Sequence, residues 1–358
     1  MPTIRLAFVC LLSLFLAVPV LAQEEPRRMP MLENMRTYDS VSYYVERELQ
    51  RIIRSDLKPE ERQAAVANLF MAVSDKLFQF ARTPDEYRQA YDTKFIGLDN
   101  LILAGKEENM EENYPRLKAE FKKEFNRWAD FSDEMVALLA SLDGKESESE
   151  TRYWNNIPRQ IAARAFEAAE KYKVPAEQVV KEWTEHFMAA AYEVSVEKKK
   201  ELVMMLEVSA RLAYGSDPKL YGKTLDDKDF DWESLRGKYV LIKFTDMFAE
   251  FLETPRMLKA YEQYREKGLE IVVVYVEPYG DMKEDPVEAV QKHLADKNRS
   301  WIILSTELTR RAKQPAHMEF YGIVGGVPHM VLADKEGKVM MTKARGESLQ
   351  TKLAEIFE

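Results

Sequence analysis

Cysteine is almost absent from this chain, because one residue, Cys10, occurs among its 358 residues. Cys10 lies in the apolar run 6–18, and a small-residue pattern typical of a signal-peptide cleavage site follows at 20–22. We therefore expect residues 1–22 to be a secretory signal peptide and the mature chain, without a further membrane span, to be exported to the periplasm or cell envelope, or secreted. A mature chain without cysteine has no disulfide, thiolate metal site or thiol nucleophile.

An excess of positive charge is also missing, since 52 Lys and Arg residues stand against 61 Asp and Glu residues, for a net charge of −9. With no basic stripe in the sequence, we do not expect nucleic-acid binding. The chain also lacks a G-x-S-x-G nucleophile pattern and a glycine-rich phosphate loop that opens a helix. We therefore predict no cofactor.

Histidine is scarce as well, with four residues in the chain. Glu182 and His186 are four residues apart on a predicted helix and could place two metal ligands on one face. A third ligand is not identifiable, so we interpret the pair as a solvated face and predict no metal site. We expect His293 to be solvated and His317 to be a surface or packing residue.

Helical periodicity extends over residues 38–213, after a polar segment, 23–37, that we predict to be a disordered leader. Residues 83–86 carry a strong helix start, with an N-cap threonine, a proline in the first turn and a glutamate three residues after the cap. The acidic run 145–150 is predicted to be an exposed linker. The expected helices are 38–54, 59–80, 84–103, 114–142, one that opens near Pro158, and 176–212 with a break at 194–200 left open. A bundle and a set of irregular helical hairpins both fit this pattern.

The hydrophobic period changes from 3.6 to 2 at residues 214–218, which we predict to be a domain boundary. From 214 to 358, strands alternate with helices and end in a hairpin, which predicts a mixed sheet flanked by helices. The fold class is therefore an all-helical domain followed by an α/β domain. The expected strands are 239–244, 269–276, 302–304, 329–332 and 339–342, and the expected helices are 255–267, 286–296, 308–313 and 347–357.

Several short motifs follow one another between residues 220 and 358. They are Phe230-Asp231-Trp232, Leu235-Arg236-Gly237-Lys238, Pro255, Trp301, Tyr321-Gly322-Ile323, Gly326-Val327-Pro328, Asp334-Lys335-Glu336-Gly337-Lys338 and Ala344-Arg345-Gly346. In this order and spacing the region resembles TlpA-like (redoxin) thioredoxin-fold domains. The resemblance implies a helix with a kinking proline at Pro255, a cis-proline at Pro328 and a CxxC pair on the loop after the first core strand.

The CxxC pair that the resemblance implies is missing. Counting back from Pro255 places the two cysteines at Met247 and Glu250, and counting forward from the core strand places them at Ala249 and Leu252. Disulfide exchange requires a thiolate, and neither a thioether nor a carboxylate replaces it. We therefore predict neither thiol-disulfide oxidoreductase nor thiol peroxidase activity. Lys243 also departs from the family, in which an acidic or amide residue is usual at this position.

The resemblance also implies a peptide-binding groove, in which the backbone of the cis-proline loop pairs with an extended peptide. The candidate groove residues are Phe248, Val327, Pro328 and His329. The alternative is that Pro328 only ends its strand. We predict a redox-inactive protein with a binding or scaffolding role, whose partner is a protein or an extended peptide. Two alternatives stay open: an accessory protein that presents substrate to a cysteine-bearing partner, and a helical interaction protein in which the thioredoxin-like domain is a stability module.

Overall fold

The computed structural model describes residues 32–142, 144–189, 196–276, 285–295, 300–323 and 326–358. The predicted signal peptide and most of the predicted leader lie outside these ranges. The end of the leader was predicted wrongly as disordered, because Leu32–Asn34 form a turn of 3-10 helix (η1) and Met35 is buried. No helix among the described residues is both long enough and apolar enough to cross a membrane.

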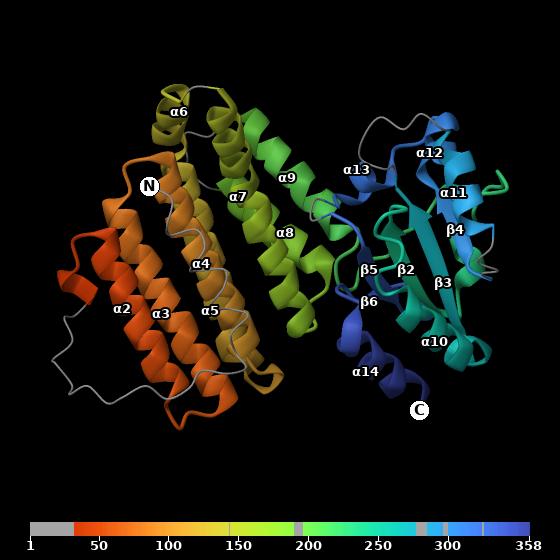
Figure 1. The fold of residues 1–358 in the computed structure, drawn as a ribbon, viewed down its shortest axis with the longest axis horizontal. Coiled ribbons are helices and arrows are strands. Elements are labelled where there is room, and N and C mark those ends of the chain that lie inside the picture. The colour runs from red at the N-terminus through yellow and green to blue at the C-terminus, as the bar shows by residue number, and fades with distance from the viewer. Residues whose placement is uncertain (1–31, 143, 190–195, 277–284, 296–299, 324–325) are drawn as a thin grey trace.

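The N-terminal part consists of helices that lie side by side (Figure 1). Thr37 and Thr83 cap α2 and α4 with capping boxes, so the predicted helix start at 83–86 is confirmed. Two short 3-10 turns, η1 and η2 (Glu107–Asn109), accompany the α-helices. The α-helices are α2 (Tyr38–Ile53), α3 (Pro59–Phe80), α4 (Pro84–Ala104), α5 (Met110–Asp130), α6 (Ser132–Ala140), α7 (Gly144–Lys171), α8 (Ala176–Ala189) and α9 (Val196–Ala210).

Two sequence-based helix predictions in this part were wrong. The predicted helix 114–142 is two helices, α5 and α6, which meet at Phe131. The acidic run 145–150 is the first part of α7, so Pro158 lies inside this helix and does not open it. Glutamate is a good helix former, and an acidic run without apolar residues carries no periodicity that distinguishes helix from linker. For the predicted helix 176–212, whose break was left open, the structure describes two helices, α8 and α9.

The C-terminal part is a mixed sheet covered by helices on both faces (Figure 1), which confirms the predicted thioredoxin-like fold. The strand order is β1-β4-β3-β2-β5-β6; β2, β3 and β4 are parallel, and β1, β5 and β6 are antiparallel to their neighbours. The strands are β1 (Lys223–Thr224), β2 (Tyr239–Thr245), β3 (Leu269–Tyr275), β4 (Ile302–Ser305), β5 (His329–Ala333) and β6 (Val339–Met341). The helices are η3 (Trp232–Leu235), α10 (Thr254–Tyr264), η4 (Arg265–Lys267), α11 (Pro286–Leu294), α12 (Thr306–Arg311), α13 (His317–Tyr321) and α14 (Gly346–Phe357).

Alternate residues of the central strands enter two separate cores, as the period of two in a strand requires. Leu241 and Ile271 face α10 and α14, where Met257 and Leu353 are fully buried. The other face packs against Tyr321 of α13 and against residues that precede β2, such as Leu220 and Trp232. Because both faces are covered, β2 and β3 are almost continuously apolar.

The two parts of the chain are joined by direct contacts. Residues of the connecting segment pair with the outer edge of the sheet: the Gly215 N–H donates to the Val339 carbonyl (2.7 Å), and the Val339 N–H donates to the Ser216 carbonyl (2.8 Å). At the end of α9, the Arg211 guanidinium donates to the Phe320 carbonyl (2.6 Å) and lies 3.9 Å from the centre of the Phe320 ring.

A second set of contacts joins α7 to the segment after β6. The Glu170 carboxylate accepts hydrogen bonds from the N–H of Thr342 (2.9 Å) and from its hydroxyl. Glu167 forms an ion pair with Lys343 (2.7 Å). The α/β part therefore contacts the helical part near two separate helices, α7 and α9, through the segment after β6 and through α13.

Candidate functional site

The loop between β2 and α10, residues 246–253, occupies the position at which the resemblance places the CxxC pair. The Asp246 carboxylate accepts a hydrogen bond from the Ala249 N–H (2.6 Å), and the Leu252 N–H donates to the Ala249 carbonyl (3.0 Å). Glu253, in the left-handed region (φ 63°), leads into α10, which begins at Thr254. Pro255 therefore lies in the first helical turn, where its missing N–H costs no hydrogen bond. The expectation that Pro255 kinks the helix from within was wrong.

Neither register of the predicted CxxC positions contains a thiol. Met247 is partly buried and packs against the core beneath α10, and Glu250 is 3% exposed. In the other register, Ala249 is buried and Leu252 is exposed. The chain has no cysteine besides Cys10, so this loop performs no exchange through a cysteine pair. Which of the two registers corresponds to the family's cysteines stays a prediction.

The side chain of Lys243 extends into this loop and holds its backbone in place. The side chain extends from β2 and is 1% exposed. Its ammonium donates to the carbonyls of Glu250 (2.7 Å) and Leu252 (2.6 Å) and lies 3.3 Å from the Thr254 hydroxyl. Hydrogen bonds from a buried cation are the strong ones, so the lysine holds the backbone of the loop against the sheet.

A buried carboxylate accompanies this buried cation. Glu250 lies between α10 and α11, where its carboxylate is 3.5 Å from the His293 Nε2 and 3.4 Å from the Thr254 hydroxyl. His293 was predicted to be solvated, and this was wrong, because α11 brings it against the loop. Buried charges are retained where they are paired and hydrogen-bonded. A cation, a carboxylate and an imidazole therefore lie together at the loop where the resemblance places the CxxC pair.

The predicted groove residues lie at the end of β5, beside this loop. The Val327-Pro328 peptide bond is cis, as the resemblance implied. His329 begins β5 and pairs with Phe244 near the end of β2, with the two rings 6.2 Å apart. Burial, together with the nearby Arg345, lowers the pKa of His329 to about 4. The imidazole is therefore neutral at physiological pH.

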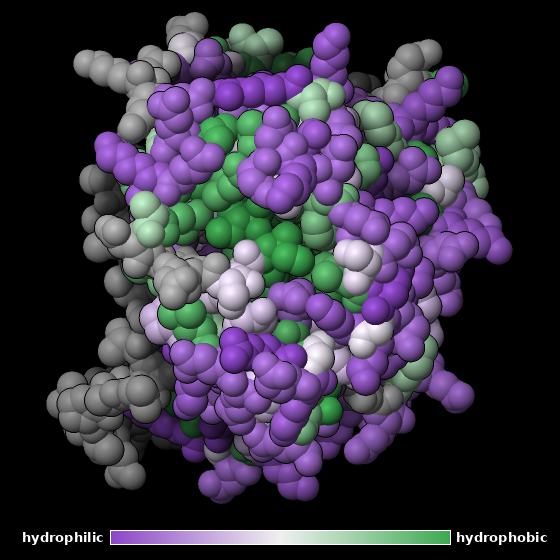
Figure 2. Space-filling model, turned by 90° about the vertical axis from the view of Figure 1, so that its right-hand side faces the viewer, coloured by the Kyte–Doolittle hydropathy of each residue, from purple (hydrophilic) through white to green (hydrophobic). Residues whose placement is uncertain are grey.

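Apolar side chains emerge from the same loop and from the adjoining part of α10. Phe248 is 71% exposed and Phe251 is 67% exposed, and Leu252 and Leu258 are also exposed. These four are the exposed large apolar side chains in the described part of this domain, and we call them the apolar loop surface. Figure 2 shows the side of the molecule turned away from the helical domain, where hydrophobic residues gather in the centre among hydrophilic ones. Sequence analysis singled out Phe248 as a groove residue, named Leu252 only as a possible cysteine position, and missed Phe251 and Leu258.

The remaining candidates have structural partners. Glu182 pairs with Lys118 (2.9 Å) and accepts from Gln178 (3.1 Å), while the His186 Nε2 lies 3.1 Å from the Asn126 side-chain oxygen. Among the residues that the structure describes, no group of three metal-ligating side chains occurs. His317 is fully buried, with its ring nitrogens 2.8 Å from the Thr306 hydroxyl and 2.8 Å from the Tyr221 carbonyl, so it is a packing residue.

Comparison with known proteins finds similar solved structures. The thioredoxin domain of a thiol-disulfide oxidoreductase from Bacteroides vulgatus is 27% identical and matches 41% of this chain and 99% of that chain, with a TM-score of 0.34. A thiol:disulfide interchange protein from Bacteroides sp. is 28% identical over 41% of this chain and 91% of that chain (TM-score 0.31). A thioredoxin-like protein from Bacteroides caccae is 15% identical and matches 84% of this chain and 95% of that chain (TM-score 0.47). No protein-family profile and no curated protein matches the chain.

Proposed function

We propose that this chain is an exported, redox-inactive thioredoxin-like protein that binds a polypeptide partner at the apolar loop surface. The observation that carries the proposal is the exposure of Phe248 and Phe251 on the loop that replaces the dithiol. A phenylalanine buries roughly 150–250 Å² when it is covered. At about 25 cal/mol per Å² of apolar surface, covering the exposed part of each ring is worth roughly 3 kcal/mol before ordering costs.

The fixed backbone beneath these rings supports the proposal. Asp246 caps the turn, and Lys243 binds two of its carbonyls. The phenylalanines are therefore presented from a loop whose conformation is set before the partner arrives, and such preorganisation reduces the entropy lost on binding. A fixed exposed aromatic pair is the kind of anchor that dominates protein interfaces.

The end of β5 offers the second element of recognition. Residues 327 and 328 precede β5, and the register of β5 with β2 places this segment beside the start of the loop. An extended chain that pairs with the backbone here would lay its side chains alternately toward and away from the apolar loop surface. We therefore expect an extended segment with apolar residues at alternate positions as the partner.

The experiment measures binding of fluorescently labelled extended peptides, with alternating apolar and polar residues, by fluorescence anisotropy. We expect Phe248→Asp and Phe251→Asp each to raise the Kd about tenfold or more, because a central aromatic anchor is worth about 2 kcal/mol. Leu103→Asp is the matched control, since Leu103 is an equally exposed apolar residue (63%) on α4. The proposal is wrong if both loop variants bind as the wild type does, or if Leu103→Asp weakens binding equally.

A further inference from the structure

Sulfur in the mature chain is expected only as methionine, because Cys10 lies in the predicted signal peptide and 17 methionines occur in the sequence. A thioether cannot exchange disulfides, but it can accept one oxygen from an oxidant and become a sulfoxide, which reductases convert back. Met247, on the loop 246–253, is partly exposed, whereas Met257 and Met330 in the core beneath it are 0% and 3% exposed. Of these three sulfur atoms, that of Met247 is therefore the one that an oxidant in solution can reach.

A small cavity of about 10 Å³ adjoins Met247 at the ends of the parallel strands β3 and β4. Its other lining residues include Tyr275 at the end of β3, Val290 of α11 and Ser305 at the end of β4. One water-sized oxygen requires a volume of about 10–15 Å³. The cavity therefore has room for about one oxygen atom beside the thioether.

Tyr275 brings to this region a buried hydrogen-bond donor without an acceptor. The residue is 3% exposed, and its hydroxyl has no hydrogen-bond partner among the residues that the structure describes. Burial raises the pKa of this hydroxyl, so it stays protonated and able to donate at physiological pH. Two other lining residues do have partners: the Ser305 hydroxyl accepts from the Leu308 N–H (3.3 Å), and Glu307 pairs with Arg311 (3.0 Å). A buried polar group without a partner is uncommon in a native structure and calls for an explanation.

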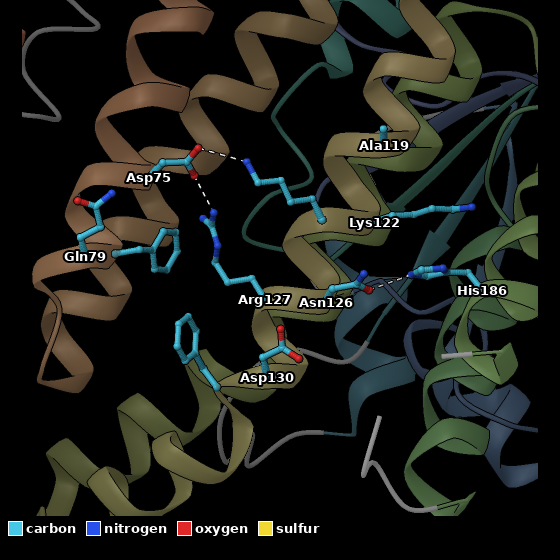
Figure 3. A pocket seen from close by; sticks show the side chains of 11 residues that line it. Asp75, Gln79, Ala119, Lys122, Asn126, Arg127, Asp130 and His186 are labelled. Carbon is cyan, nitrogen blue, oxygen red and sulfur yellow. Dashed lines mark hydrogen bonds and ion pairs between the residues drawn. The ribbon is translucent and has the colours of Figure 1, made fainter. Parts of the chain in front are cut away.

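The larger hollow in the helical domain, of about 820 Å³ between α3, α5 and α8, gives no comparable signal (Figure 3). Polar side chains that line it are already paired with one another. The Asp75 carboxylate is 2.7 Å from the Arg127 guanidinium, and the Asn126 side-chain oxygen is 3.1 Å from the His186 Nε2. These groups therefore indicate no ligand, whereas the Tyr275 hydroxyl does lack an acceptor.

We propose that Met247 is a site of reversible oxidation by a peroxide, and that the sulfoxide oxygen occupies the cavity and accepts a hydrogen bond from the Tyr275 hydroxyl. A thioether sulfur is a weak acceptor, whereas the oxygen of the polar sulfoxide is a good one. The unbranched methionine side chain is flexible, so it can turn the new oxygen toward the cavity after the oxidant has reached the sulfur from the exposed side. The inference does not depend on the function proposed for the apolar loop surface.

The oxidation step needs hydrogen peroxide and no group of the protein besides the thioether. The sulfur lone pair attacks one oxygen of the peroxide, and the O–O bond breaks as the S–O bond forms. The proton on the transferred oxygen passes to the leaving hydroxide, which becomes water. The sulfur loses two electrons and the peroxide gains them. The step modifies the chain itself and is not an exchange reaction that the chain catalyses.

The first test treats the full mature chain with hydrogen peroxide and follows the oxidation of each methionine by mass spectrometry of its peptides. We expect Met247 to be oxidised before the buried Met257, which is 0% exposed. Met188 and Met204, which are 53% and 59% exposed, are the references for free access to the oxidant. The inference is overturned if Met247 reacts no faster than Met257.

The second test reduces the oxidised chain with methionine sulfoxide reductases specific for the two epimers. A reductase must reach the sulfoxide oxygen, so a hydrogen bond inside the cavity slows the reduction. Tyr275→Phe removes only a hydroxyl without a partner and should speed the reduction at Met247 about fivefold, the factor that corresponds to one neutral hydrogen bond. The sulfoxides at Met188 and Met204, in the same sample, should be reduced at unchanged rates.

Tyr91→Phe is the matched control. The Tyr91 hydroxyl is likewise buried without a hydrogen-bond partner in the described part of the chain, but it belongs to α4 in the helical domain. This variant should leave the reduction at Met247 unchanged. The inference is overturned if Tyr275→Phe leaves that rate unchanged, as expected if the cavity holds only water, or if Tyr275→Phe speeds the reduction of the exposed sulfoxides by the same factor. It is also overturned if Tyr91→Phe has the same effect as Tyr275→Phe.

Discussion

Replacing Lys243 with methionine keeps the length of the side chain and removes the ammonium that holds the 246–253 loop. The carbonyls of Glu250 and Leu252 then lose their donor, and the Glu250 carboxylate, 3% exposed, loses the nearby positive charge. Hydrogen bonds to a charged group are worth about 1.5–3 kcal/mol each. Removal of one partner from a buried charged set typically costs about 3–5 kcal/mol. We expect a loss of this size in the free energy of unfolding of the thioredoxin-like domain.

Amide hydrogen exchange is the appropriate assay, because two joined domains need not unfold as one unit. The slowest amides of β2 and β3 report global opening of this domain, and the amides of Ala249 and Leu252 report opening of the loop alone. The matched control is Lys238→Met. Lys238 is 45% exposed and pairs with Glu270 at 3.1 Å, and a surface pair of this kind contributes at most about 1 kcal/mol.

The outcome that refutes the reasoning about Lys243 is a loss below about 1 kcal/mol, equal to that of the Lys238→Met control. Such a result would mean that water replaces the ammonium at both carbonyls without cost. If the loop amides exchange faster while β2 and β3 keep their protection, the lysine fixes the loop but contributes little to the stability of the sheet. Binding at the apolar loop surface should then weaken in Lys243→Met, although no residue of that surface has changed.

Two further predictions concern the fold around this site. Gly222→Ala should destabilise the protein by at least about 1 kcal/mol more than Gly268→Ala. Both glycines have positive φ, but a Cβ on Gly222 would lie 2.7 Å from the Thr309 hydroxyl and 3.0 Å from the His317 ring, whereas Gly268 faces open space. Equal losses of stability in urea unfolding would contradict this packing argument. Burial lowers the pKa of His329 to about 4, against about 6.5 in the unfolded chain. The stabilisation from its neutral ring is therefore complete above pH 6.5 and is lost as the pH falls toward 4. His329→Gln should reduce the loss of stability between pH 7 and pH 4.5, and an unchanged pH dependence would show that His329 does not contribute.

The sequence predicted those features that depend on local patterns. The capping box at Thr83, the apolar strand 239–244 and the order of strands and helices after residue 214 all follow from short-range signals. The division between α5 and α6 could not be predicted, because the apolar stripe continues through Phe131. The first turns of α7 carry no apolar face, so an acidic helix and an acidic linker looked alike.

The candidate site was predicted only in part, for a related reason. The missing cysteines and the unusual Lys243 are visible in the sequence, but the carbonyls that this lysine binds depend on the path of the loop. The pairing of Glu250 with His293 joins residues 43 positions apart through the packing of α11, and no periodicity indicates it. The polar face of α5 can likewise be recognised in the sequence. The packing of α3 and α8 beside it is a tertiary contact that no local pattern indicates.

The connecting segment also determines which edge of the sheet a partner can use. By exchanging hydrogen bonds with Val339, Gly215 and Ser216 occupy backbone groups that β6 would otherwise present to solvent. An unpaired edge is a template for uncontrolled strand addition and aggregation. The chain thus covers the β6 edge of the sheet with its own backbone at Val339. For the extended partner that we propose, the end of β5 and the phenylalanine-bearing loop then remain as the place of attachment.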